Sequence, residues 1–266
     1  MSDHTVRIAA AQLRMGSPAE NLEKHVAFIA RAAADRARIV LFPELAVGDG
    51  AEPLDGPAVT RLRQAAREAG IYVIPCFMEQ REDGRYVSAP LIGPEGDIVG
   101  VYRKTHAWPE WDHKLGDQYP VFDLGFAKVG IMICFDKRFP EVARLLAVQG
   151  ADIILTPNSS DARGERWEPW SEPEAFRMYH QMRALENGVY VAATNKIGPV
   201  QDTECYGGTC ICNPTGRIVV DADVSEGLVM HDCDLDLVRQ VREYRLCNRR
   251  PPSYGGLITE GAPTRN

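Results

Sequence analysis

The segment 130–141 reads Gly130-Ile-Met-Ile-Cys134-Phe-Asp-Lys-Arg-Phe-Pro140-Glu141 and changes from apolar to charged residues at a single cysteine. The apolar run 129–133 has the composition of a buried strand, and Pro140 suits the first turn of a helix. A cysteine between a strand and a helix is held in place by the strand and exposed at the turn. The first N–H groups of such a helix favour a thiolate. The segment therefore predicts a nucleophilic cysteine.

Two further strand-like segments are followed by a charged residue. The segment 41–45 reads Leu-Phe-Pro-Glu-Leu and places Glu44 after an apolar run, while 101–106 reads Val-Tyr-Arg-Lys-Thr-His and places Lys104 similarly. A cysteine nucleophile needs two groups beside it. One is a carboxylate that can take the thiol proton, and the other is a side chain with a fixed positive charge. Alone, Glu44 would suit a helix cap and Lys104 a solvated strand end. Their joint occurrence with Cys134 predicts a catalytic site.

Strand and helix patterns alternate in the first half of the chain, and neighbouring strands occur at 86–103 and after residue 207. Helices are predicted at 18–33, 57–68, 140–148, 173–187 and 235–244, and strands at 6–13, 38–42, 71–77, 86–92, 98–103, 129–133, 151–156, 189–194, 207–212, 218–221 and 228–232. This order favours an α/β (α+β) fold with a mixed sheet and helices on its outer face. No linker or repeat divides the chain, so we expect one domain over residues 1–266. Its irregular tail, at about 246–266, is expected either to form part of a dimer interface or to be partly disordered.

Composition narrows the class of protein. The 266 residues carry a net charge of −7, which argues against a nucleic-acid partner. No stretch reaches the roughly 18 apolar residues of a membrane span, and the N-terminus lacks the pattern of a signal peptide. Seven cysteines at irregular spacing fit free thiols in a reducing compartment. We therefore expect a cytoplasmic protein without a membrane partner.

Glu44, Lys104 and Cys134, in this order along the chain, resemble the catalytic triad of the carbon–nitrogen hydrolase (nitrilase) superfamily. The segments 183–196, 207–216 and 248–254 are also similar to that superfamily, so the resemblance covers nearly the whole chain. It implies a four-layer α-β-β-α sandwich, in which two sheets stack face to face. It also implies homodimers or larger homo-oligomers, and no cofactor or metal.

The resemblance implies a role for each matching residue. Glu44 would take the thiol proton, and Lys104 would stabilise the oxyanion together with the backbone N–H of Phe135. A second glutamate follows the lysine in the superfamily, and Glu110 is the best match here. The sequence departs from the usual pattern directly after it, at 113–116, so Asp112 remains an alternative for this fourth carboxyl position.

The residues after the nucleophile indicate the branch. True nitrilases usually carry Cys-Trp-Glu, whereas this chain has Cys134-Phe-Asp136, which resembles the amidases and carbamoylases. We expect an amidohydrolase that releases ammonia from small linear amides through a thioester acyl-enzyme. N-carbamoyl amino compounds are the alternative substrates. A true nitrilase, or a binding member without activity, is less favoured.

The segment 158–174 is a candidate for substrate recognition. Arg163 and Arg166 could bind a substrate carboxylate with paired hydrogen bonds, and Trp167 with Trp108 could line an apolar pocket. A surface loop at a dimer interface would explain the same residues equally well. The cysteines at 205, 210 and 212 lack the Cys-x-x-Cys pairing of structural zinc sites, so no metal site is predicted.

Overall fold

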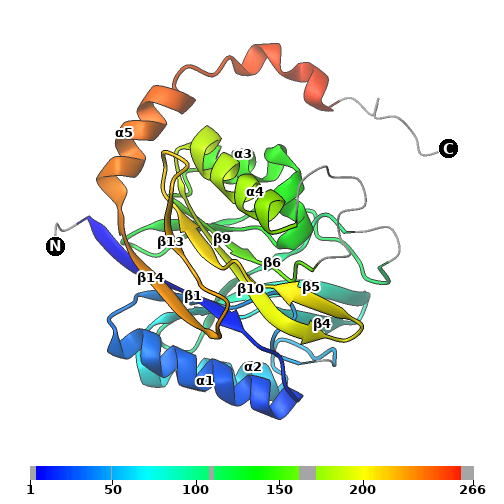
Figure 1. Ribbon diagram of the computed structural model, residues 1–266. Coiled ribbons are helices and arrows are strands. Elements are labelled where there is room, and N and C mark those ends of the chain that lie inside the picture. The colour runs from blue at the N-terminus through cyan, green and yellow to red at the C-terminus, as the bar shows by residue number, and fades with distance from the viewer. Residues whose placement is uncertain (1–3, 49, 108–110, 162–171, 259–266) are drawn as a thin grey trace.

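The computed structural model describes residues 4–48, 50–107, 111–161 and 172–258. Figure 1 shows strands packed in the middle of the molecule, with α1 and α2 on one side and α3 and α4 on the other. The strands are β1 (Thr5–Leu13), β2 (Ile39–Leu41), β3 (Tyr72–Ile74), β4 (Phe77–Arg81), β5 (Gly84–Ile92), β6 (Ile98–Arg103), β7 (Val121–Asp123), β8 (Lys128–Ile131), β9 (Ile153–Pro157), β10 (Tyr190–Val200), β11 (Thr203–Tyr206), β12 (Cys210–Cys212), β13 (Ile218–Asp221) and β14 (Gly227–Asp234). The helices are α1 (Pro18–Ala34), α2 (Pro57–Ala69), α3 (Pro140–Val148), α4 (Glu172–Asn187) and α5 (Leu235–Leu246), with short 3₁₀ segments η1 (Cys134–Arg138), η2 (Pro251–Ser253) and η3 (Gly255–Ile258).

The strands form two layers that face each other. Their main path runs β4-β5-β3-β2-β1-β10-β9-β8-β7, and β1 and β10 join the two layers by a short parallel pairing. One buried cluster contains Ile39 and Leu41 from the first layer together with Val129 and Leu155 from the second. This shared core lies between the layers, because the side chains of a strand alternate between its two faces.

Helices cover the outer face of each layer. One cluster packs α1 and α2 against the first layer, with Ile29 and Leu62 among its buried residues. Another packs α3 and α4 against the second layer, with Leu146 and Ala184 buried. The predicted four-layer α-β-β-α sandwich is confirmed.

Local sequence signals explain several boundaries. At the start of α1, Glu20 N–H donates to Ser17 Oγ and Ser17 N–H donates to the Glu20 carboxylate, and these two bonds form a capping box. Helix α2 ends at Gly70, whose φ of +66° is easily reached only without a Cβ. Helix α3 has the predicted bounds, and β5 and β6 form the predicted hairpin.

The predicted single strand at 71–77 is two strands in the structure. Strand β3 pairs in parallel with β2, while β4 pairs antiparallel with β5. The chain changes neighbour between Ile74 and Phe77, a change that local apolar composition does not reveal. Strand β10 extends to Val200, beyond the predicted end at residue 194, because it pairs in turn with β9, β12, β1 and β11.

The end of the described chain lies outside the sandwich. Helix α5 buries only Leu235 and Val238, and the segment after it passes along the outside of the molecule (Figure 1). Its predicted dimer contact stays a prediction, as do the single-domain boundaries. Within the described residues, no helix combines the length and apolar character needed to cross a membrane.

Candidate active site

The candidate site lies where several strands end. Strands β1, β2 and β3 are parallel to one another, as are β8, β9 and β10. The carboxyl ends of parallel strands meet at the same edge of a sheet. Glu44 follows β2, Cys134 follows β8, and Lys104 follows β6. The fold thus brings residues from both layers to one end of the sandwich.

Glu44 and Lys104 form a buried ion pair. Lys104 Nζ lies 2.6 Å from Glu44 Oε1, and the two side chains are 1% and 0% exposed. Among the described residues, Glu44 Oε2 has no hydrogen-bond partner. Burial, the largest single effect, lowers the pKa of Lys104, but the charge of Glu44, the charge of Cys134 and the hydrogen bond to Glu44 together outweigh burial and hold that pKa above its ordinary value. The lysine therefore stays charged at neutral pH, and one carboxylate oxygen remains available to accept a proton.

Cys134 opens the 3₁₀ segment η1 and is partly buried. Its φ of +45° is rare for a residue with a Cβ and is typical of strained turns at functional sites. Burial, followed by the negative charge of Glu44, raises the pKa of the Cys134 thiol, and Lys137 and Lys104 only partly oppose this. The expectation that the helix start would favour a thiolate is therefore wrong. The resting group is a thiol that needs a base.

Asp136 organises the turn around this cysteine. Its buried carboxylate accepts hydrogen bonds from Tyr102 Oη at 2.7 Å, Thr105 Oγ1 at 3.0 Å, and the backbone N–H groups of His106 at 2.9 Å and Ile133 at 2.8 Å. Three of these donors lie within two residues of Lys104 in sequence. Sequence reasoning missed this network. The tyrosine and threonine on either side of the lysine segment were the available signal.

Ser160 fixes the other side of the thiol. Its Oγ lies 4.0 Å from Cys134 Sγ and accepts a hydrogen bond from Lys137 Nζ at 3.2 Å. The backbone of Ser160 is held by the Asn195 side chain, which accepts from its N–H at 2.8 Å and donates to its carbonyl at 3.1 Å. The ends of β8, β9 and β10 are thereby tied together around the cysteine.

The remaining predicted residues lie elsewhere. Asp112 pairs with Arg85 at 2.7 Å with a side chain that is 97% exposed, so it does not reach the buried ion pair. Trp111 places its ring 4.6 Å from Lys104 Nζ. Five predicted residues lie outside the described part of the chain: Trp108, Glu110, Arg163, Arg166 and Trp167.

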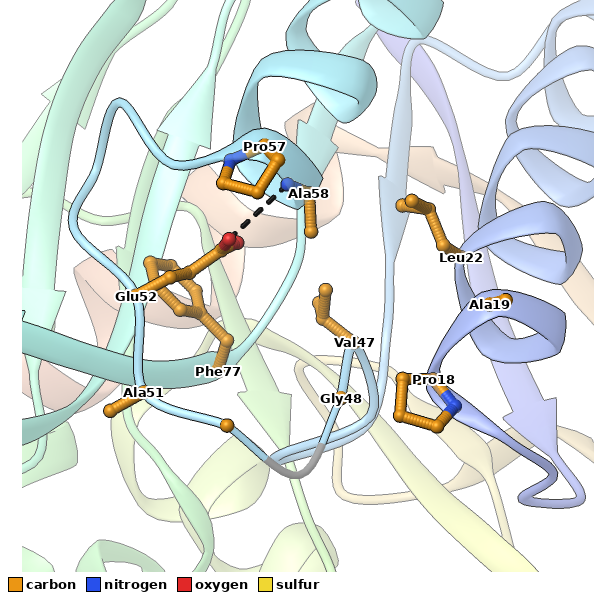
Figure 2. A pocket seen from close by; sticks show the side chains of 11 residues that line it. Pro18, Ala19, Leu22, Val47, Gly48, Ala51, Glu52, Pro57, Ala58 and Phe77 are labelled. Carbon is orange, nitrogen blue, oxygen red and sulfur yellow. Dashed lines mark hydrogen bonds between the residues drawn. The ribbon is translucent and has the colours of Figure 1, made fainter.

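A separate hollow lies between the first turns of α1 and α2. It encloses about 380 Å³, and in Figure 2 the Glu52 carboxylate points from its wall toward the backbone N–H of Ala58. Its lining consists of Pro18, Ala19, Leu22, Val47, Gly48, Gly50, Ala51, Glu52, Pro57, Ala58 and Phe77. None of these is a predicted site residue, so the strand ends and not this hollow form the candidate active site. In the described residues no group of three or more His, Cys, Asp or Glu side chains is placed to hold a metal.

Known proteins resemble this chain over most of its length. The sequence profile of the carbon-nitrogen hydrolase family matches residues 7–243. A nitrilase of Pyrococcus abyssi is 33% identical over 255 residues, which span 89% of this chain and 93% of that protein. An N-carbamoylputrescine amidase of Arabidopsis thaliana is 33% identical over 223 residues, or 76% of this chain and 74% of that protein.

The fold has solved counterparts as well. A variant of the amidase from Nesterenkonia sp. AN1, showing the result of Michael addition of acrylamide at its active-site cysteine, superposes with a TM-score of 0.79. It is 25% identical and covers 95% of this chain and 100% of that one. Together with the profile match, these likenesses show that the chain belongs to the carbon-nitrogen hydrolase family.

Proposed function

We propose that this protein is a cysteine amidohydrolase that cleaves small linear amides and releases ammonia through a thioester acyl-enzyme. The observation that carries the proposal is the buried Glu44–Lys104 pair at 2.6 Å, at the same end of the sandwich as Cys134. A buried carboxylate–lysine pair of this kind adds little to the free energy of unfolding, because the desolvation of the two charges costs about as much as their attraction contributes. A reaction that uses both charges accounts for them.

In the first half-reaction Cys134 Sγ attacks the amide carbon and forms a carbon–sulfur bond. The thiol proton passes to Glu44 Oε2, which has no other hydrogen-bond partner among the described residues. Glu44 then protonates the amide nitrogen as the carbon–nitrogen bond breaks, and ammonia leaves. The raised pKa of the thiol makes this base necessary.

The tetrahedral intermediate carries a negative oxygen. Lys104 supplies a fixed charge for it, and the backbone N–H of Phe135, next to the nucleophile, supplies a hydrogen bond. Donors that are already in place stabilise such an oxyanion without reorganisation, and each is typically worth about 10²–10³ in rate. Glu110 is proposed to keep Lys104 in position or to assist proton transfer.

In the second half-reaction water replaces ammonia. Glu44 takes a proton from the water, whose oxygen attacks the thioester carbon, and the carbon–sulfur bond breaks. The carboxylic acid leaves, and Cys134 regains its proton. Each turnover therefore consumes one amide and one water, and produces one acid and one ammonia.

Relatives of this chain differ in their named substrates, so the branch is part of the proposal. Asp136, where true nitrilases usually have glutamate, favours amides over nitriles. N-carbamoyl amino compounds are the second candidate, because the Arabidopsis relative named for such a substrate is 33% identical. Nitriles are also included in the substrate panel below, because the Pyrococcus relative is named a nitrilase.

The test is ammonia release from a panel of short primary amides, N-carbamoyl amino compounds and nitriles. The Cys134→Ala protein is assayed as the blank, since the substitution removes the nucleophile with little change in volume. We expect release from amides by the wild-type protein alone. Release from nitriles alone would contradict the proposed branch, and equal release by the alanine variant would contradict the mechanism.

A further inference from the structure

Lys137 lies in the 3₁₀ segment that begins with the proposed nucleophile, and it has no role in the proposed mechanism. The residue is 3% exposed, and lysine is seldom buried to this extent. Its ammonium group donates a hydrogen bond of 3.2 Å to Ser160 Oγ, a neutral hydroxyl that brings no negative charge to the lysine. A buried ammonium group is costly, and a negative charge that forms nearby offsets part of this cost.

Ser160 lies between this lysine and the thiol. Its Oγ is 3.2 Å from Lys137 Nζ and 4.0 Å from Cys134 Sγ. Because the lysine donates to one lone pair of the hydroxyl oxygen, the hydroxyl hydrogen is left for donation to the sulfur. A chain of hydrogen bonds from Nζ–H through Oγ–H to Sγ is stronger when its last acceptor is negative. The arrangement therefore favours a thiolate over a thiol.

The surrounding structure holds both members of this chain in place. The Asn195 side chain binds the backbone N–H and carbonyl of Ser160 at 2.8 and 3.1 Å. Arg183 of α4, itself 6% exposed, donates to the backbone carbonyl of Lys137 at 2.9 Å. The ring of Phe176, also on α4, has its centroid 5.7 Å from Lys137 Nζ. A lysine held at both its backbone and its ammonium group keeps its charge at a fixed distance from the sulfur.

Charges of both signs act on the thiol. Burial and then Glu44 raise the pKa of the Cys134 thiol, whereas Lys137, followed by Lys104, lowers it. Lys104 is bound to the Glu44 carboxylate at 2.6 Å, so these two charges largely cancel. Lys137 thus supplies a positive charge that the ion pair does not. The titratable groups that interact electrostatically with Cys134 are Glu44, Lys104, Lys137, Lys196 of β10 and the thiol of Cys205 of β11.

We propose that Lys137 is a positioning residue that orients the Ser160 hydroxyl toward Cys134 and thereby stabilises the thiolate of the nucleophile. In the proposed reaction a thiolate forms twice. It forms when Glu44 takes the thiol proton, and again when the carbon–sulfur bond of the acyl-enzyme breaks and its electron pair returns to sulfur. The statement about catalysis rests on the proposed amidohydrolase function, whereas the effect on the thiol can be measured without turnover.

The first test follows the alkylation of Cys134 by iodoacetamide as a function of pH. The thiolate displaces iodide and the thiol does not react, so the midpoint of the rate profile reports the ionisation of the sulfur. Mass spectrometry of the digested protein locates the label at residue 134. Lys137→Met removes the charge, Lys137→Arg retains it, and Ser160→Ala removes the hydroxyl with little change in volume. Lys128→Met is the matched control on β8, where the lysine side chain is 49% exposed. Urea unfolding checks that each variant is folded, and Ser160→Ala carries the test if Lys137→Met is not.

We expect the alkylation midpoint to rise by about one pH unit in Lys137→Met and in Ser160→Ala. Lys137→Arg should retain most of the wild-type behaviour, and Lys128→Met all of it. Adding Lys137→Met to Ser160→Ala should shift the midpoint much less than Lys137→Met does alone, because the lysine acts through the hydroxyl. An unchanged midpoint in the single variants, or shifts that simply add in the double variant, would overturn the proposal.

The second test measures ammonia release from an amide that the wild-type protein hydrolyses. A thiolate that is less stabilised leaves the acyl-enzyme more slowly, so Lys137→Met should lower kcat by about tenfold with little change in KM. Lys137→Arg should restore most of the rate. A loss confined to KM would overturn the catalytic part of the proposal. A midpoint that depends on Lys137, in a protein that hydrolyses no amide, would contradict the hydrolase function alone and leave the effect on the thiol supported.

Discussion

The Tyr102 hydroxyl donates a hydrogen bond of 2.7 Å to Oδ2 of Asp136. This bond joins β6, the strand that Lys104 directly follows, to the turn that carries Cys134. The two residues belong to opposite layers of the sandwich, and both are buried. The relative positions of the proposed nucleophile and the proposed oxyanion lysine therefore depend on a carboxylate that takes no part in the proposed chemistry.

Asp136→Asn should reduce both stability and turnover. At least four donors point at the two carboxylate oxygens, and an amide can accept at only one of its two positions. We expect a loss of about 2–4 kcal/mol in the free energy of unfolding and at least about a tenfold fall in kcat. Urea unfolding and ammonia release measure the two effects. Tyr102→Phe is the control, expected to cost about 1 kcal/mol, and an asparagine variant as stable as wild type would refute the network's role.

Cys134→Ala should abolish turnover while the protein remains folded. The side chain is partly buried and small, so its removal creates little cavity. Incubation with acrylamide, which adds to the active-site cysteine of the Nesterenkonia amidase, should label the wild-type protein and leave residue 134 of the variant unlabelled. Mass spectrometry of the digested protein locates the label. Turnover close to that of wild type would exclude the acyl-enzyme mechanism.

Lys104→Met should lower kcat by about 10²–10³ and the free energy of unfolding by about 3–5 kcal/mol, because it leaves the carboxylate of Glu44 buried without a partner. The double variant Lys104→Met with Glu44→Gln removes both charges. It should recover most of the stability and none of the activity. If the double variant were no more stable than the single one, the buried carboxylate would not be the cause.

The protein should lose stability as pH falls from about 6.5 to about 4. Burial lowers the pKa of His25 from 6.5 to about 4, because its ring lies under Phe42 at 4.1 Å and its Nε2 has no partner among the described residues. The unfolded chain binds a proton in this range and the folded chain does not, so acid favours unfolding. The contribution of His25 reaches roughly 2 kcal/mol by about pH 5.

His25→Gln should flatten this dependence, as measured by urea unfolding at about pH 7.5 and about pH 5. Some slope should remain, since burial also lowers the pKa of His180, to about 3. A variant that loses stability with acid as steeply as wild type would show that other groups control the transition.

EDTA should leave ammonia release unchanged, because the proposed mechanism draws its charge stabilisation from Lys104 and the backbone. The measurement is turnover before and after chelation and dialysis. If EDTA inhibited the protein and added zinc restored activity, the metal-independent mechanism would be contradicted. The cysteines at 205, 210 and 212 would then be the candidate zinc ligands.

The sequence predicts the features that depend on neighbouring residues. Ser17 and Glu20 signal the start of α1, the bounds of α3 agree with those predicted, and the hairpin of β5 and β6 follows from two short apolar runs around a turn. The positions of Glu44, Lys104 and Cys134 at the ends of strands also follow from local pattern. Capping, turn chemistry and strand length are decided within a few residues.

The features that depend on residues distant in sequence could not be predicted from local sequence patterns. In helix α1 the polar residues Asn21 and His25 are buried. Asn21 bonds the backbone of Gly16, and the His25 ring stacks on Phe42, so their burial depends on contacts outside the helix. The hydrogen bonds that join Tyr102 and Thr105 to Asp136 likewise arise only when the two layers meet. The roles proposed for Glu110 and for the predicted substrate-binding residues stay predictions.

Glu44 and Lys104 belong to the layer covered by α1 and α2, whereas Cys134 belongs to the layer covered by α3 and α4. During synthesis the base and the cation emerge before the nucleophile, and neither layer alone holds the complete set. Under the proposed mechanism, an unfinished or half-docked chain exposes only an ordinary thiol. The activated nucleophile then forms only at the last stage of folding. Electrophiles are therefore less able to modify Cys134 in immature chains.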